Sequence, residues 1–141
     1  MSSPVSSPMS GSGPKQAIYA ELAGVAQALG HGHRLELLEH LAQAPRSVEE
    51  LSARARLSFA NTSRHLQILR RARLVDAERR GKQVIYRLAG EAEVVTLLRS
   101  LASVGERNIT HGFPITVTLP PDQRGTVFGR SLLEFAANRR R

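Results

Sequence analysis

The spacing of hydrophobic residues predicts two helices at the start of the folded region. From Lys15 onward, apolar residues recur every three or four positions, as they do on one face of an α-helix. Gly30 and Gly32 interrupt this pattern, and a second run of leucines continues until Pro45, which cannot extend a helix. The apolar positions on the two predicted faces are Ile18, Leu22, Val25 and Leu29, then Leu35, Leu38 and Leu41.

Two shorter helices are predicted next, each with a capping residue. Ser47 is a favourable N-cap, and Glu50 three residues later completes a capping box for a third helix through Leu51. Ser58 caps a fourth helix that extends to about Ala72. In this fourth helix we expect leucines to face inward and polar side chains to face outward: Leu66 and Leu69 inside, Arg64, Gln67, Arg70 and Arg71 outside.

The hydrophobic period then changes to two, which predicts a β-hairpin. We expect strands at residues 74–78 and 84–88, joined by a tip at residues 79–82 in which Gly81 supplies a positive φ. From Glu91 a last long helix carries one apolar stripe: Val94, Leu97, Leu98, Leu101 and Val104. The predicted fold is mainly α with a small β-hairpin wing, in the order helix, helix, helix, helix, strand, strand, helix.

Composition divides the 141 residues into one folded domain with two tails. Residues 1–14 are rich in Ser, Pro and Gly and carry no charge, so we expect them to be disordered. Residues 15–111 hold the helices and strands of the predicted domain, and a short strand at ITVTL and a short helix at Leu132–Ala137 stay open beyond it. Prolines and a glycine break the pattern in residues 112–141, a C-terminal extension of unknown role that is either disordered or packed across a second subunit.

Several classes of protein are disfavoured by what the sequence lacks. The chain has no cysteine, so it offers no disulfide, thiolate metal ligand or thiol redox switch. No apolar run approaches the roughly 20 residues that span a bilayer, and the N-terminus lacks the charge and apolar core of a secretory signal. We therefore expect a cytoplasmic protein without a membrane partner. There is also no Gly-rich phosphate loop or nucleophile beside a histidine, so an enzyme is not predicted.

Positive charge is concentrated in residues 54–87. This segment holds ten of the twenty Lys and Arg residues and only two acids, Asp76 and Glu78, so its net charge of +8 equals that of the whole chain. Such localised charge is typical of a surface that binds a polyanion. A basic helix followed by a basic hairpin is what a winged helix-turn-helix needs to hold duplex DNA; a solvated basic helix is the weaker alternative.

The side chains of this segment suit both readout and positioning of DNA. Asn and Gln pair with adenine, Arg with guanine, and Ala or Thr with a thymine methyl group, whereas Arg and Lys elsewhere suit phosphates or the minor groove. Tyr86 could donate to a phosphate, but its alternation with apolar neighbours favours packing. The candidate readout residues are Ser58, Ala60, Asn61, Thr62, Ser63, Arg64 and Gln67, and the candidate positioning residues are Arg54, Arg56, Arg70, Arg71, Arg79, Arg80 and Lys82.

Three motifs in this order resemble the ArsR/SmtB family of bacterial winged-helix repressors. They are ALGHGHRLELLEHL in the second helix, SVEELSARARLSFANTSRHLQILRRARLV in the helix-turn-helix, and RRGKQVIYRL in the wing. The resemblance covers roughly residues 17–108. The helix-turn-helix is most similar to that of relatives fused to rhodanese domains, and residues 112–141 are too few to form such a domain.

The resemblance implies a homodimer whose first and last helices form the interface. It also places His65 near the DNA, although a helix-capping or half-buried role is equally open. The two apolar stripes could instead close the core of the monomer. The residues that the resemblance assigns to the dimer interface are Ile18, Leu22, Val25, Val94, Leu97, Leu98 and Leu101.

Neither metal-sensing pattern of the family is complete in this chain. The cysteine positions are occupied by Ser47 and Glu49, and the last-helix positions by Glu91, Glu93, Val104 and Arg107, which fall short of the four ligands that zinc requires. A second candidate, His31 and His33 with His111 or Glu106, lies in a Gly-rich turn where histidines more often face solvent. We therefore predict no metal and no cofactor, and the inducer is not identified.

The sequence as a whole predicts a sequence-specific transcriptional regulator, a repressor that binds an inverted repeat of double-stranded DNA as a homodimer. Two alternatives stay open. One is a constitutive DNA-binding protein without a small-molecule inducer, and the other is a winged-helix module that binds an acidic protein partner.

Overall fold

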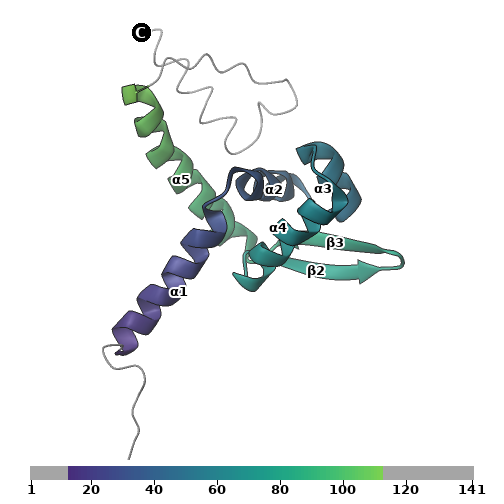
Figure 1. Cartoon of the computed structure of the whole chain (residues 1–141), viewed down its shortest axis with the longest axis horizontal. Coiled ribbons are helices and arrows are strands. Elements are labelled where there is room, and N and C mark those ends of the chain that lie inside the picture. The colour runs from purple at the N-terminus through teal and green to yellow at the C-terminus, as the bar shows by residue number, and fades with distance from the viewer. Residues whose placement is uncertain (1–12, 113–141) are drawn as a thin grey trace, which may run out of the picture.

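The computed structural model describes residues 13–112, with side chains described through residue 107. The described residues form five helices and three strands (Figure 1). In chain order these are α1 (Pro14–Leu29), α2 (Gly32–Gln43), β1 (Arg46–Ser47), α3 (Val48–Ala55), α4 (Phe59–Arg71), β2 (Val75–Arg80), β3 (Gln83–Leu88) and α5 (Glu91–Gly112). The predicted order is confirmed, with one strand added. Nearly all of the predicted N-terminal tail and C-terminal extension lies outside the described residues.

Leucines of α2, α3 and α4 form the core together with the sheet. Leu66 and Leu69 are fully buried, which confirms the predicted inward face of α4. Tyr86 on β3 is only 4% exposed, so it packs against the core, as its alternation with apolar residues favoured. The other fully buried apolar side chains are Leu37, Leu38, Leu51, Val75 and Leu98.

The predicted caps fix where α3 and α4 begin. The Ser47 hydroxyl accepts from the Glu50 N–H at 3.1 Å, and the Glu50 carboxylate accepts from the Ser47 N–H at 3.4 Å, a complete capping box. At the start of α4 the Ser58 hydroxyl accepts from the Asn61 N–H at 3.1 Å. Between the two helices, Arg56 adopts the left-handed conformation with φ of 55°, which turns the chain sharply into α4.

The wing, residues 75–88, is a hairpin with a shorter tip than the sequence predicted. β2 continues through Arg80, because Arg79 pairs with Val84 and Arg80 with Gln83. The tip is therefore Gly81 and Lys82 rather than residues 79–82, and Gly81 has the expected positive φ, 62°.

A third strand, β1, was not predicted. Its two residues pair antiparallel with β3, Arg46 opposite Tyr86 and Ser47 opposite Ile85, so the sheet order is β1-β3-β2. A strand of two residues shows no alternation that sequence analysis could detect. Its effect is to hold the start of α3 against the base of the wing.

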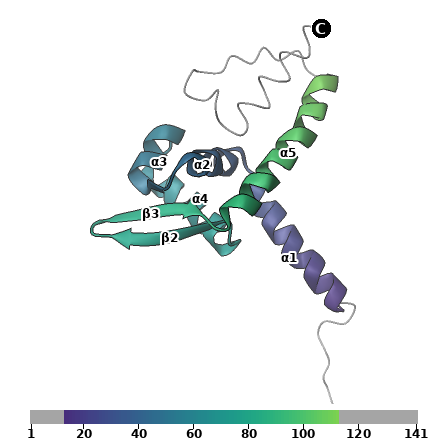
Figure 2. The same ribbon diagram turned by 180° about the vertical axis from the view of Figure 1, so that it is seen from behind.

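Helices α1 and α5 extend away from the core as two long rods (Figures 1 and 2). Of the α1 residues, only Ala28 and Leu29 at its C-terminal end are buried. No helix in residues 13–112 is long and apolar enough to cross a membrane.

Candidate nucleic-acid interface

The outer face of α4 presents mainly polar side chains at the surface. Ala60, Asn61, Arg64 and Gln67 are exposed, and Ser63 is half-buried. The Asn61 side-chain oxygen accepts from the Arg64 guanidinium at 3.3 Å, so these two groups are held side by side on the outer face. Donors and acceptors of this kind match the edges of bases in the major groove.

The prediction that Thr62 takes part in base readout is wrong. Its side chain is completely buried, and its hydroxyl donates to the Ser58 carbonyl at 2.9 Å. Thr62 lies four residues before Leu66, so both side chains point to the same inward face of α4. Its methyl group therefore cannot reach a thymine.

Most of the positive charge in residues 54–87 is available at the surface. Nine of its ten Lys and Arg side chains are exposed, and Arg87 is half-buried. The Glu78 carboxylate binds Arg87 at 2.7 Å and Arg80 at 3.4 Å, so one acid partly neutralises the middle of the wing. Among the ion pairs of the described residues, none involves Lys82 at the wing tip. The exposed Lys and Arg side chains of residues 54–82 form what we call the basic surface.

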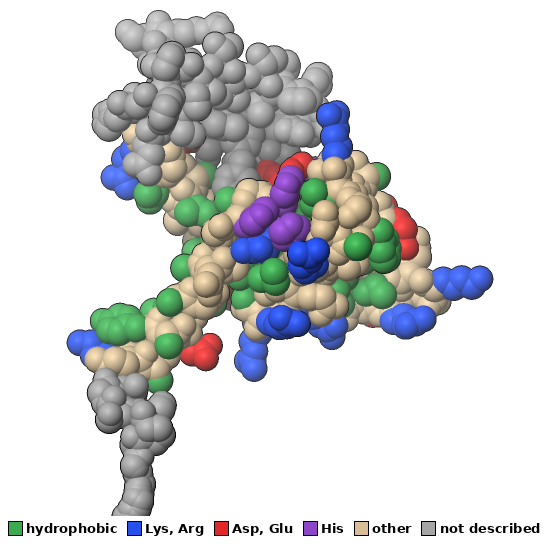
Figure 3. All heavy atoms as spheres, viewed as in Figure 1, with side chains coloured by type: hydrophobic (Ala, Val, Ile, Leu, Met, Phe, Trp, Pro, Cys, Tyr) green, Lys and Arg blue, Asp and Glu red, His purple; other side chains and the backbone are tan. Residues whose placement is uncertain are grey.

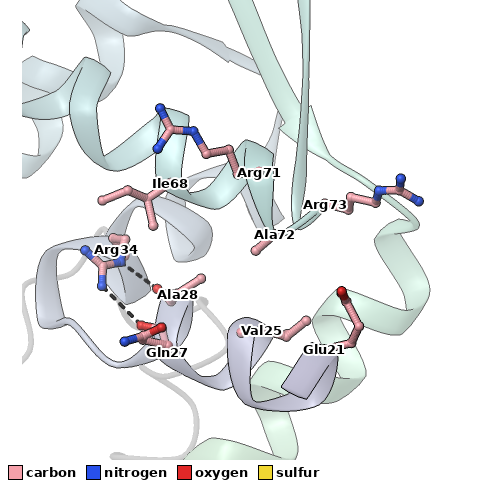
Figure 4. A pocket seen from close by; sticks show the side chains of 10 residues that line it. Glu21, Val25, Gln27, Ala28, Arg34, Ile68, Arg71, Ala72 and Arg73 are labelled. Atoms are coloured by element: carbon pink, nitrogen blue, oxygen red, sulfur yellow. Dashed lines mark hydrogen bonds between the residues drawn. The ribbon is translucent and has the colours of Figure 1, made fainter. Parts of the chain in front are cut away.

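Arg34 links three helices beside this surface. Its Nε donates to the Ala28 carbonyl at 2.6 Å and its Nη2 to the Gln27 carbonyl at 3.2 Å, which ties the end of α1 to α2 (Figure 4). Its Nη1 lies 3.4 Å from Nδ1 of His65 on α4. The side chain of His65 is half-buried, so the half-buried role left open by the sequence is the one observed, and contact with DNA stays a prediction.

Three histidine rings cluster around this link. The ring centroid of His65 lies 4.6 Å from that of His31 and 5.8 Å from that of His33, and His31 also caps α2 by accepting from the His33 N–H at 3.2 Å. Histidine and Lys or Arg side chains lie next to each other on this face of the molecule (Figure 3). The side chain of His111, one of the predicted partners, lies outside the described residues, and Glu106 belongs to α5.

Burial and positive neighbours act on the histidines of the helix-turn-helix. Burial, followed by the charges of His31 and Arg34, lowers the pKa of His65 from its ordinary value. The neutral ring is the form that can accept from Arg34. Burial also lowers the pKa of His40, against the opposing effect of Glu36, whose carboxylate lies 3.6 Å from Nε2 of His40.

Among residues 13–107, no group of three or more His, Asp or Glu side chains is arranged to hold a metal ion. Glu91 and Glu93 are both exposed in the first turn of α5.

The predicted dimer interface divides into exposed and buried residues. Ile18 and Leu22 are each 60% exposed on α1, and Leu97 and Leu101 are 38% and 37% exposed on α5. Val25 is half-buried. The first turns of α5 lie on the core, so two of the predicted interface residues instead pack inside their own chain: Val94 and Leu98.

Tyr19 and Val104 extend the exposed apolar surface beyond the predicted residues, with 58% and 49% of their side chains exposed. Together with Ile18, Leu22, Leu97 and Leu101 they form what we call the apolar surface of α1 and α5. A pocket of about 900 Å³ lies between α1 and the C-terminal half of α4, where Val25, Ala28, Ile68 and Ala72 contribute apolar walls (Figure 4).

Comparison with known proteins identifies relatives over about two thirds of this chain. The family model described as bacterial regulatory protein, arsR family, matches residues 31–77. An HTH-type transcriptional regulator of Mycobacterium tuberculosis is 35% identical over 95 residues, 67% of this chain and 42% of the relative. The chain thus spans less than half the length of that relative.

Two further proteins are matched over most of their length. The biofilm growth-associated repressor of Agrobacterium fabrum is 36% identical over 91 residues, 63% of this chain and 78% of the relative. A solution structure from Mycobacterium bovis, described as the homodimeric winged helix-turn-helix DNA-binding domain of a possible ArsR-family transcriptional regulator, superposes with a TM-score of 0.63. It is 32% identical and the match covers 79% of this chain and 97% of that one. These findings confirm the predicted fold and resemblance, and the chain belongs to the ArsR family of bacterial regulatory proteins.

Proposed function

We propose that this protein is a homodimeric transcriptional repressor that occupies an inverted-repeat operator in double-stranded DNA. The proposal rests on one observation. The exposed positive charge of residues 54–87 lies on the same part of the chain as the polar outer face of α4 and the wing. The names of the relatives support it, since one is a repressor and another is a homodimeric DNA-binding domain.

In this proposal α4 enters the major groove. Asn61, Arg64 and Gln67 lie on its exposed side and supply the donors and acceptors that read base edges. Arg79, Arg80 and Lys82 of the wing contact phosphates or the adjacent minor groove. The remaining proposed contacts are Arg54, Arg56, Ser58, Ala60, Ser63, His65 and Arg70.

A second subunit covers the apolar surface of α1 and α5. Large apolar side chains such as Leu22 and Tyr19, which are about 60% exposed in one chain, are stabilised when a second copy removes them from water. Two-fold symmetry then places two α4 helices on one face of the dimer, which matches an inverted repeat. Residues 15–111 form the DNA-binding and dimerisation unit in this proposal, and we place the protein in the cytoplasm as a regulator rather than an enzyme.

Site selection from a random-sequence duplex library tests the proposal. We expect recovery of an inverted repeat, and an affinity for it well above that for a scrambled duplex. Equal affinity for both duplexes would favour a constitutive, nonspecific DNA-binding protein. Failure to bind any duplex at low salt would favour the protein-binding module instead.

A further inference from the structure

Phe59 is an exposed aromatic residue in an unexpected place. Seven large apolar side chains are exposed in the part of the chain that the structure describes, and six of them belong to the apolar surface of α1 and α5. The seventh is Phe59, which is 57% exposed and is the first residue of α4. The pocket residues show that α1 lies beside the other, C-terminal end of α4, so the proposed dimer surface does not account for it.

The chain neighbours of Phe59 are small side chains, most of them polar. It follows the capping residue Ser58 and precedes the exposed Ala60 and Asn61. Within residues 13–107, no other large apolar side chain of α3, α4 or the wing is exposed. A protein partner would require a larger apolar patch at this point. A single exposed phenyl ring on an otherwise polar part of the surface fits a single apolar group on a polar, anionic partner.

Duplex DNA presents one such group in the major groove, the C5-methyl of thymine. Helical side chains point back toward the N-terminus of their helix, so a side chain at the first position projects beyond the helix end. Residues at the N-terminal end of a recognition helix are those that approach base edges. Thr62, the longer of the two residues that the sequence offered for this role, is buried, and Ala60 carries only one methyl group.

We propose that Phe59 is a specificity-determining residue that contacts the C5-methyl group of a thymine in each operator half-site. This inference rests on the proposed function and deepens it, because it assigns a base and an atom to one residue. It also assigns the thymine contact to the aromatic ring of Phe59 instead of to Thr62.

Replacement of thymine by deoxyuridine tests the contact, because uracil lacks the C5-methyl group but keeps the same pairing edge. Each symmetric pair of thymines in the selected operator is replaced in turn, and affinity is measured by fluorescence anisotropy. At one pair we expect wild-type affinity to fall by about fourfold per lost methyl contact, or about 15-fold for the two half-sites. Phe59→Ala should bind the original operator correspondingly more weakly and lose no further affinity at that pair.

Two further variants distinguish loss of the methyl contact from a general loss of binding or of folded protein. Phe59→Leu retains an apolar side chain and should keep part of the dependence on the methyl group. Gln67→Ala removes an exposed polar residue of the same helix and should weaken binding while leaving that dependence unchanged. Thermal unfolding monitored by circular dichroism checks that each variant retains the helical fold.

The possible results separate this inference from the proposed function. An operator without thymine in its half-sites, or uracil substitutions that affect wild type and Phe59→Ala equally, would overturn the role of Phe59 alone. The preference of the wild type for the selected operator over a scrambled duplex is measured first. Absence of that preference would overturn the proposed function and this inference together.

Discussion

The two exposed surfaces of this small protein have opposite chemistry. Around α4 and the wing, Phe59 is the one large apolar side chain exposed among the described residues, and the rest of the exposed surface consists mainly of arginines, a lysine and other polar side chains. Along α1 and α5 several large apolar side chains are instead exposed, and Ile18, Tyr19 and Leu22 each leave more than half of their area exposed. The first surface is suited to a polyanion and the second to another apolar surface. The difference fits the proposal that the core is complete within one chain and that a second copy covers the apolar surface of α1 and α5.

The two regions are physically connected through Arg34. One guanidinium group binds the last carbonyls of α1 and the ring of His65 on α4. Within the proposed dimer, a change in the angle of α1 would therefore be transmitted through Arg34 to α4. In the proposed dimer, this link connects the end of α1 to α4, the helix that we propose contacts DNA.

The largest expected effect comes from charging the apolar surface. Leu22→Glu and Leu101→Glu each place a carboxylate where a second copy should lie, so the dimer should dissociate. Loss of the second half-site should then lower operator affinity about 100-fold or more. Sedimentation velocity and anisotropy measure the two effects.

Ser103→Glu is the matched control for these variants. Ser103 is exposed and lies half a turn of α5 away from Leu101, so the same charge should leave the dimer intact. A dimer that survives Leu22→Glu and Leu101→Glu would contradict the assignment of this surface.

The next effect in size is the response of DNA binding to salt. If the basic surface neutralises six or more phosphates, affinity should fall by about three decades between 50 and 200 mM salt. Arg80→Ala and Lys82→Ala should each weaken binding to all sequences and reduce the salt slope by about one. Arg99→Ala removes an exposed cation of α5, outside the basic surface, and should leave the slope unchanged. A wing double variant with undiminished affinity would show that the hairpin does not touch DNA.

Readout of individual bases gives a smaller and more local effect. Arg64→Ala removes an exposed guanidinium held beside Asn61 and should cost about 1–3 kcal/mol at one position of each half-site. Binding to a panel of singly mutated operators measures this cost. A uniform loss across all sequences would assign Arg64 to phosphate contact instead.

The smallest expected effect is the dependence of thermal stability on pH, which we assign to the histidines. Because burial and positive neighbours lower the pKa of His65 below 6.5, the unfolded chain binds more protons than the folded chain just below that value. The free energy of unfolding that the neutral His65 ring contributes is fully present above the ordinary pKa of histidine. It is lost as the pH falls through the lower pKa of His65 in the folded chain. The melting temperature should therefore drop between about pH 7.5 and 5.5, and less so in a His40→Gln, His65→Gln variant. An unchanged pH dependence in that variant would contradict this assignment.

Local signals in the sequence predicted most of the fold. Capping residues fixed the starts of α3 and α4, and the change of period located the wing. The same helical spacing that placed Leu66 inside also places Thr62 inside, four residues earlier, so its burial could have been predicted. The two-residue strand β1 carried no comparable signal.

Non-local features could not be predicted from the pattern. An apolar stripe shows that a face is buried but not by which chain, so Leu98 in the core and Leu101 at the surface look alike in the sequence. The contact of Arg34 with His65 joins residues 31 positions apart. The exposure of Phe59 likewise depends on what the rest of the chain leaves uncovered.

The central claim is that two copies of this chain bind one inverted repeat through α4 and the wing. Sedimentation of the protein with a labelled inverted-repeat duplex, a single half-site and a scrambled duplex tests it most directly. We expect two protomers on the inverted repeat, with the half-site and the scrambled duplex bound far more weakly. One protomer per inverted repeat at undiminished affinity, or equal binding to the scrambled duplex, would contradict it.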